Sequence, residues 1–338
     1  MITSALSGCG YLIQAAQGQS QLMQARQPID HLIANDSTDA KLKARLELVR
    51  AARDFASREL ALPDNGSYRS YAALGRPYVV WNVVAAPEFS VAPKTWWFPI
   101  TGRVAYRGYF KEENARRFAL GLEAEGYDTL VGGVSAYSTL GRFSDPVLDT
   151  MMPYGDLQLV GTIFHELAHQ LVYVKSDSEF NEAFAVSVEQ AGLKRWLESR
   201  GQGGQLDDYR ARAEQQARIV GRFAAGRAEL AGFYRESESM PTPERRRRKK
   251  ELMEKISTSV RQLELSLGLR TGYDTWLDAG LNNAHLASVA TYYDCVPGFE
   301  RLLAAKHDDL PAYYKAVREL ARGPASARAE LCARQPAT

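Results

Sequence analysis

The sequence is poor in cysteine, with only Cys9, Cys295 and Cys332 in 338 residues. Three widely spaced thiols are too few for a thiolate metal site or a disulfide scaffold, so any zinc ion would have to be held by imidazole and carboxylate groups. The chain also lacks an apolar run of the roughly 18 residues that a membrane-spanning helix needs. Its formal net charge is only +2, and so small a charge gives no overall field that favours nucleic acid or a membrane surface.

What the sequence does have is enough apolar material for a sizeable core. Hydrophobic residues make up 45% of the chain and charged residues 24%, as in globular proteins that fold without a partner. One large domain or two smaller ones would fit this length. We expect an N-terminal segment of residues 1–10 followed by a single domain of residues 11–338.

The N-terminal segment contains Leu6-Ser7-Gly8-Cys9, a pattern typical of the lipobox of bacterial lipoproteins. The eight residues before Cys9 lack the basic region and full apolar stretch of a signal peptide. Either the true start lies upstream and Cys9 carries a lipid, or Cys9 is an ordinary cysteine. The first interpretation predicts a lipid-anchored protein of the bacterial cell envelope, on the periplasmic face of the outer membrane, with the glutamine-rich residues 14–21 as a tether. The second predicts a cytoplasmic protein.

Hydrophobic periodicity predicts a mostly helical α+β fold. Helical spacing of apolar residues recurs at Leu42, Leu46, Val49, Ala52 and Phe55. β-Branched and aromatic residues interrupted by proline and glycine predict short strands within residues 78–110, and another strand at residues 129–137. Further helices are expected at residues 111–125, at residues 155–200 in two pieces, and at residues 205–267, where Pro241-Thr242-Pro243 divides a long projecting hairpin.

A basic run from Arg245 to Lys250 suggests phosphate binding at first sight. It follows a proline that can begin a helix, and Leu252, Ile256 and Val260 continue an apolar stripe at helical spacing. We therefore assign the charges to a solvated helix face, or to a face near anionic lipid headgroups, and expect no nucleic-acid partner.

The clearest chemical signal is His165-Glu166-Leu167-Ala168-His169. Histidines four residues apart on a helix lie one turn above each other, so both imidazoles can reach one tetrahedral zinc ion. Glu166 then lies beside the metal, where it can act as the general base that takes a proton from a water activated by zinc. The apolar stripe Val160, Phe164, Leu167 and Leu171 independently predicts that this segment is a buried helix.

Chance does not explain this motif. With five histidines in 338 residues, a random occurrence of the pattern has a probability of about 0.005. The alternative interpretation is that both histidines are core residues whose nitrogens bond to backbone carbonyls.

A catalytic zinc site needs a third protein ligand, and Glu179, Glu182 and Glu189 are the candidates. A helix break at about residues 175–177, with Asp177 or Ser178 as N-cap, would make the second helix run back along the first. Glu182 then lies level with His169, whereas Glu189 lies about 10 Å further along. The geometry favours Glu182 as ligand and leaves Glu179 or Glu189 to support a ligand or bind a substrate amine.

These residues resemble the gluzincin class of metallopeptidases, in which the third ligand lies in an Asn-Glu step such as Asn181-Glu182. More closely, the chain is similar to the bacterial family of predicted zinc-dependent aminopeptidases. The similarity covers nearly the whole chain and is carried by Cys9-Gly10-Tyr11, residues 105–110, residues 136–141, the zinc segment, and residues 282–297.

The resemblance also has departures. The spacing from His169 to Glu182 is shorter than in thermolysin-like enzymes, and Val186 stands where those enzymes often have an acidic residue. Relatives often have a cysteine pair at the positions of Trp97 and Arg103, so that disulfide is absent here.

The substrate cleft is less well defined by the sequence. In gluzincins a strand upstream of the zinc helix pairs with the peptide substrate, and residues 131–140 occupy that place, although an ordinary interior strand is an equal alternative. A tyrosine or histidine should stabilise the oxyanion, and we favour Tyr292 among the candidates, which are Tyr292, Tyr293, His285 and Tyr137. The carboxylates that could hold a substrate ammonium are Glu179, Glu189 and Asp145. We assign structural or surface roles to His31 and His307.

Together these features predict an active-site helix under a small mixed sheet, in a core of residues 78–200, with a projecting hairpin at about residues 205–267. The predicted function is that of a zinc metallopeptidase, an aminopeptidase by resemblance, that binds one Zn²⁺ through His165, His169 and Glu182 and cleaves a peptide substrate. Glu166 and Tyr292 are the predicted catalytic residues. The alternative is a catalytically silent, membrane-tethered peptide-binding protein with a structural or vestigial zinc site.

Overall fold

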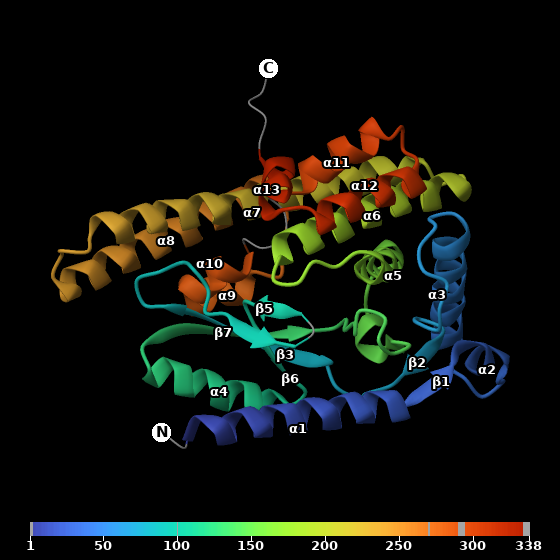
Figure 1. The fold of residues 1–338 in the computed structure, drawn as a ribbon, viewed down its shortest axis with the longest axis horizontal. Helices are drawn as coiled ribbons and strands as arrows, with labels where there is room; N and C mark the ends of the chain where they lie inside the picture. Colours follow the sequence, from blue (N-terminus) through green and yellow to red (C-terminus); the bar gives the residue numbers. More distant parts are fainter. Residues whose placement is uncertain (1–2, 100, 270, 290–294, 334–338) are drawn as a thin grey trace.

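The computed structural model describes residues 3–99, 101–269, 271–289 and 295–333, with side chains from residue 10 onward. Helices dominate these residues, and the strands form three small sheets (Figure 1). The predicted mostly helical α+β class is therefore confirmed. No helix of the described chain has the length and apolar character needed to cross a membrane.

The main sheet has the strand order β6-β3-β7 and is antiparallel. Its strands are β3 (Val80–Pro87), β6 (Arg107–Tyr109) and β7 (Tyr127–Val134). Alternate β3 residues point to opposite faces, so Trp81 and Val83 pack against α4 (Glu112–Ala124), while Val84 packs against α10 (Asn283–Val289). The sheet is thus covered on both faces, and β7 is one of its edges.

Two smaller sheets accompany the main one. The mixed sheet β1-β2-β8 joins Arg26–Pro28 and Ser70–Ala72 in antiparallel fashion, and pairs the latter with Val147–Leu148 in parallel. The hairpin of β4 (Trp96–Phe98) and β5 (Gly102–Val104) sets Trp97 directly opposite Arg103. These two positions therefore face each other across adjacent strands.

The N-terminal segment is helical from Thr3 onward, where the described residues begin. Helix α1 (Thr3–Gln24) lies beside α4 along one side of the molecule (Figure 1), and the Gln14 side chain bonds to the backbone of both Gly108 and Phe110. The glutamine-rich residues are therefore part of a packed helix, and the prediction that they form a tether is wrong. Helical spacing of the glutamines lets one side contact β6 while the other stays solvated.

The predicted long hairpin is present as α7 (Gly204–Glu236) and α8 (Thr242–Leu267), which extend beyond the rest of the molecule (Figure 1). The helices approach closely at Gly226, where an added Cβ would lie 2.5 Å from Ile256. Their shared apolar cluster, which α9 (Asp274–Ala279) and α10 complete, includes Phe223, Leu230, Met253, Ile256 and Val260.

The largest core surrounds α5 (Asp156–Leu171) and α6 (Ser178–Ser199), which pack against each other. Helix α3 (Ala40–Arg58) covers α5, and its predicted apolar positions Leu46, Val49 and Ala52 are fully buried. Helices α11 (Val296–Ala305), α12 (Leu310–Arg322) and α13 (Ala325–Cys332) cover α6. Within this C-terminal group Cys295 and Cys332 form a disulfide. The sequence predicted no disulfide scaffold; the fold brings together two cysteines 37 residues apart in the chain and forms this single cross-link.

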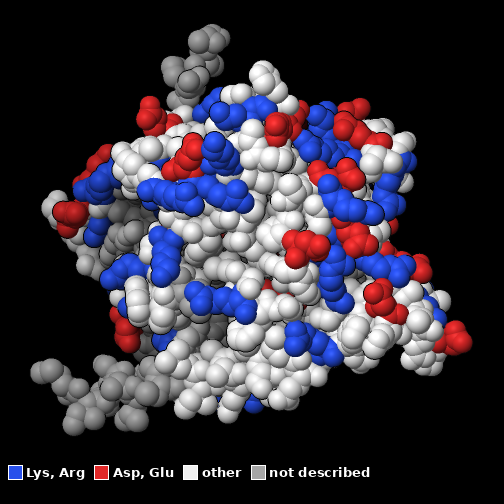
Figure 2. Space-filling view, turned by 45° about the vertical axis from the view of Figure 1, so that its right-hand side comes forward, with Lys and Arg blue, Asp and Glu red and all other residues white. Residues whose placement is uncertain are grey.

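The basic run at the start of α8 is largely neutralised by contacts within the fold. Arg246 forms an ion pair with Glu88, and Lys249 forms one with Asp128 at 2.6 Å. Arg245 lies over the Phe89 ring and bonds to Tyr234 O. On the face shown in Figure 2, Lys and Arg are likewise interspersed with Asp and Glu over much of the surface. The run thus binds the hairpin to the sheet.

Candidate metal centre

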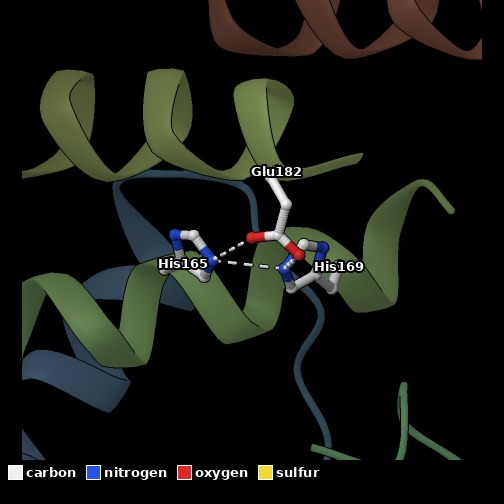
Figure 3. Close-up of side chains that lie close together, drawn as sticks. All are labelled: His165, His169 and Glu182. Carbon is white, nitrogen blue, oxygen red and sulfur yellow. Dashed lines mark hydrogen bonds and ion pairs between the residues drawn. The ribbon is translucent and has the colours of Figure 1, made fainter. Parts of the chain in front are cut away.

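The candidate site lies where α5 and α6 run side by side in opposite directions. The predicted stripe on α5 is buried, since Val160, Phe164 and Leu167 have no exposed surface. This packing turns His165 and His169 toward α6, as predicted (Figure 3). From the facing helix, Glu182 points its carboxylate between the two imidazoles.

The turn between the helices fixes the height of Glu182. Asp177 caps α6 by accepting a hydrogen bond from Phe180 N, so the predicted break and N-cap are confirmed. Next to Glu182, the buried Asn181 side chain accepts from Val174 N at 2.7 Å and donates to Val174 O at 2.8 Å. Asn181 thus links the first turn of α6 to the segment that follows α5. In the Asn181-Glu182 step, the asparagine therefore helps to hold the glutamate in position.

Three side chains converge on one point. The Nε2 atoms of His165 and His169 are 3.2 Å apart. The Glu182 carboxylate oxygens lie 3.4 Å from His165 Nε2 and 3.8 Å from His169 Nε2. A tetrahedron with metal–ligand bonds of 2.0–2.1 Å has edges of about 3.3 Å, so these separations fit a zinc ion. Within the described chain, His165, His169 and Glu182 are the group whose ligand atoms lie within 4.8 Å of one another.

The contacts argue against the view that the histidines are ordinary core residues. Neither imidazole bonds to a backbone carbonyl in the described structure; His165 contacts Glu182, Glu189 and the other histidine. His169 Nδ1 is buried and has no hydrogen-bond partner there. The two Nε2 atoms, 3.2 Å apart, and the Glu182 carboxylate surround one point, so the residues fit a bound metal.

Glu189 contacts the His165 ring at its other nitrogen. Its carboxylate is 3.2 Å from His165 Nδ1, whereas Glu182 contacts Nε2 of the same ring. Gly161 makes room for it, because a Cβ at that position would lie 2.9 Å from Glu189 Oε1. A carboxylate at this place fixes the ring orientation of a metal-binding histidine.

Protonation in the cluster is uneven. Burial lowers the pKa of His165, but its hydrogen bonds to Glu182 and Glu189 outweigh burial and raise this pKa well above its usual range. Burial lowers the pKa of His169 to about 4, and the neighbouring His165 acts in the same direction. His169 is therefore neutral at physiological pH, which is the form in which imidazole binds metals.

Glu166 is half-buried and makes no side-chain hydrogen bond within the described structure. Burial raises its pKa to about 7, and the adjacent His165 opposes this change. A carboxyl group with a pKa near neutrality can both accept and release a proton during turnover.

Several tyrosines surround these carboxylates, and the sequence analysis missed them. The pKa of Tyr106 is raised by burial and then by Glu182, and that of Tyr154 by burial and by Glu166. The Tyr173 ring lies 6.4 Å from the His169 ring. Tyr173 follows His169 by four residues but lies beyond the end of α5, so helical spacing does not account for its position. Nothing local points to Tyr106, between β5 and β6.

The structure does not bring the other predicted residues into the cluster. Tyr137 packs against Phe110, and His285 bonds to Asn282 and packs against Trp276. Tyr292 and Tyr293 lie outside the described residues. Asp145 has no exposed surface and accepts two hydrogen bonds from Thr139, so it is not available to a substrate ammonium.

The segment predicted to pair with a peptide substrate, residues 131–140, is a strand only as far as Val134, where β7 ends, and residues 135–140 form no strand. β7 pairs with β3 on one side only, and an edge strand has backbone groups on its other side that can pair with an added strand. The segment that follows β7 reaches α5, because Gly141 approaches Gln170.

Comparison with known proteins gave one match. No curated protein and no solved structure is similar to this chain at a significant level. A family model described as "putative aminopeptidase" matches residues 10–332, nearly the full length and including α5 and α6. The chain therefore belongs to the putative aminopeptidase family.

Proposed function

We propose that the protein is a zinc metallopeptidase, and specifically an aminopeptidase, with His165, His169 and Glu182 as the metal ligands. The observation that carries this proposal is the convergence of the two Nε2 atoms and the Glu182 carboxylate at 3.2–3.8 Å. Membership of the family supports the peptidase class.

The number of ligands supports a catalytic site over a structural one. A structural zinc site is closed by a fourth protein ligand, whereas a catalytic site keeps a position open. The described residues supply three ligands in one group. About a fifth of the Glu182 side chain is exposed, at 22%, so solvent can reach the group. A vestigial or structural site in a silent peptide-binding protein accounts less well for this arrangement.

The roles of the protein groups follow from their positions. When bound, zinc would polarise the substrate carbonyl and lower the pKa of water. Glu166 accepts the proton of the attacking water and passes it to the leaving amine. Glu189 holds the His165 ring in place through Nδ1. Tyr106 and Tyr173 keep their protons at neutral pH, since an ordinary phenol has a pKa of about 10 and the pKa of each is raised further; either can therefore donate to the developing oxyanion.

We also propose that the protein acts in the cell envelope, held by a lipid on Cys9. The Cys295–Cys332 disulfide supports this location, because disulfides form and persist mainly in oxidising compartments. Fractionation of cells that express the gene with its upstream sequence tests the anchor. The protein should be in the membrane fraction, and Cys9→Ala should release it.

Metal analysis with peptide cleavage tests the catalytic proposal. The purified protein should contain about one zinc per chain and cleave peptides with a free N-terminus but not their N-acetylated forms. Glu166→Gln should keep the zinc and lose nearly all turnover, because an amide preserves the shape but takes no proton. Turnover within tenfold of the parent would remove Glu166 as the base.

A further inference from the structure

A second feature lies directly beside the candidate metal ligands. A cavity of about 290 Å³ opens next to His169 and is lined by Leu140, Gly141, Arg142, His169, Gln170, Tyr173 and Lys175. We call it the Arg142 pocket. Its volume is at the lower end for small-ligand sites, so it suits one side chain or chain terminus rather than a long segment.

Two of the side chains that line this pocket, Arg142 and Lys175, are cations. No aspartate or glutamate lines it. Arg142 and Lys175 are both exposed, and neither forms an ion pair within the residues that the structure describes. Lys175 Nζ donates to Pro99 O at 3.4 Å, which leaves other ammonium protons available.

Gln170 adds a further donor with no acceptor. Its Oε1 accepts from Asn65 at 2.8 Å, which fixes the orientation of the amide. Its Nε2 is buried and has no partner among the described residues. A buried amide N–H that lacks an acceptor is unfavourable until a ligand supplies one.

The loop that carries Arg142 is held in place. The buried Asp145 carboxylate accepts from Thr139 N and from Thr139 Oγ1, both at 2.8 Å. Leu140 and Gly141 have φ angles of +57° and +75°, and glycine allows the second of these close to Gln170. Because Asp145 holds this irregular loop, the pocket is preorganised before a substrate binds. Preorganisation lowers the entropic cost of binding.

We infer that the Arg142 pocket binds a carboxylate of the substrate, so that the enzyme selects peptides with an acidic side chain or a free C-terminal carboxylate next to the scissile bond. This inference rests on the proposed peptidase function. A carboxylate complements two cations and an unpaired amide N–H, and His169 both lines the pocket and belongs to the candidate metal group, so a carboxylate in the pocket would lie beside that group.

Matched peptides test the inference and separate the two sources of carboxylate. One set carries Glu or Gln at each of the two residues that flank the scissile bond, and another has a free or amidated C-terminus. For the preferred set, wild type should have a kcat/KM about 10- to 100-fold higher for the charged peptide, the range expected for a charged hydrogen bond. Arg142→Ala should abolish this preference and leave the neutral peptide within about twofold.

Arg117→Ala is the matched control, because Arg117 is an exposed arginine on α4 away from the pocket. It should behave as wild type. Equal losses for charged and neutral peptides in Arg142→Ala would overturn the inference. Equal cleavage of charged and neutral peptides by the wild type would also overturn the inference, but the peptidase proposal would then stand.

Binding to the Glu166→Gln protein covers the case in which no peptide is cleaved. Titration calorimetry with the same peptide pairs should show tighter binding of the charged member, and the double variant Glu166→Gln/Arg142→Ala should lose this difference. If the wild type binds the charged peptide more tightly in a way that depends on Arg142 and yet cleaves no peptide, that result would support carboxylate binding in the Arg142 pocket and contradict the peptidase function. Equal binding of both members would overturn the pocket.

Discussion

Glu182 and Glu189 lie on the same side of α6 but contact different atoms of the histidines. Glu182 faces both Nε2 atoms, whereas Glu189 contacts His165 Nδ1. Only Glu182 can share a metal with both imidazoles, because the Nδ1 and Nε2 atoms of one ring point in different directions. The two carboxylates should therefore differ sharply in what their removal does.

Glu182→Ala should reduce zinc affinity by several orders of magnitude, comparably to His165→Ala, because a direct ligand is lost. Glu189→Ala should cost about 10- to 100-fold in affinity or activity and leave zinc in the purified protein, because only the support of a ligand is lost. Zinc content after dialysis and competition with a chelator measure both effects.

Glu198→Ala is a suitable control, since Glu198 is exposed near the far end of α6 and should bind zinc as wild type does. Zinc retained in Glu182→Ala but lost in Glu189→Ala would reverse the assignment.

Much of this site could be predicted from local spacing. The interval between His165 and His169 gives their shared helix face, and the turn near Asp177 gives the height of Glu182. The tyrosines could not be found in this way, because Tyr106 reaches Glu182 only after residues 76 apart in the chain have folded together. The Arg142 pocket could not be predicted either, because it forms between the loop that carries Arg142 and the end of α5, and no local sequence pattern shows that these two segments lie close together.

At the scale of elements, periodic helices were predictable and strand pairings were not. Helices α3, α5 and α8 follow the apolar stripes of the sequence, and Pro241-Thr242-Pro243 separates α7 from α8. The sheets join distant segments, as when Tyr71 pairs with Val147, and two- or three-residue strands carry almost no periodic signal. The disulfide was missed for the same reason, since cysteine spacing does not show which helices pack together.

That disulfide should contribute substantially to the stability of the C-terminal helices. Cys332→Ser should lower the free energy of unfolding by about 2–4 kcal/mol, because the cross-link restricts a 37-residue separation in the unfolded chain. Denaturant titration measures this loss, and reduction of the wild type should reproduce it. Zinc content should not change, because neither cysteine belongs to the metal group. An unchanged denaturation midpoint in the variant would mean that the bond does not stabilise the fold.

For the whole molecule, the metal group connects two parts of the largest core. His165 and His169 come from α5, which packs on α3, and Glu182 comes from α6, which the C-terminal helices cover. In an unfolded chain the two histidines are close in sequence and can still bind one ion together. Glu182 is not held beside them there, because its position depends on the packing of α6 against α5. Zinc should therefore bind the folded state much more tightly than the unfolded state.

This difference predicts that zinc stabilises the protein against heat. Free zinc at 100 times its dissociation constant would add about 2.7 kcal/mol to the free energy of unfolding, so chelation should lower the Tm by several degrees and zinc should restore it. Calorimetry at fixed protein concentration measures the shift. Glu182→Ala should lose most of it, because the remaining histidine pair also forms in the unfolded chain, whereas Glu166→Gln should keep it in full. If chelation leaves the Tm of wild type unchanged, or if Glu182→Ala responds to zinc as strongly as wild type, the folded protein does not use Glu182 to hold the metal.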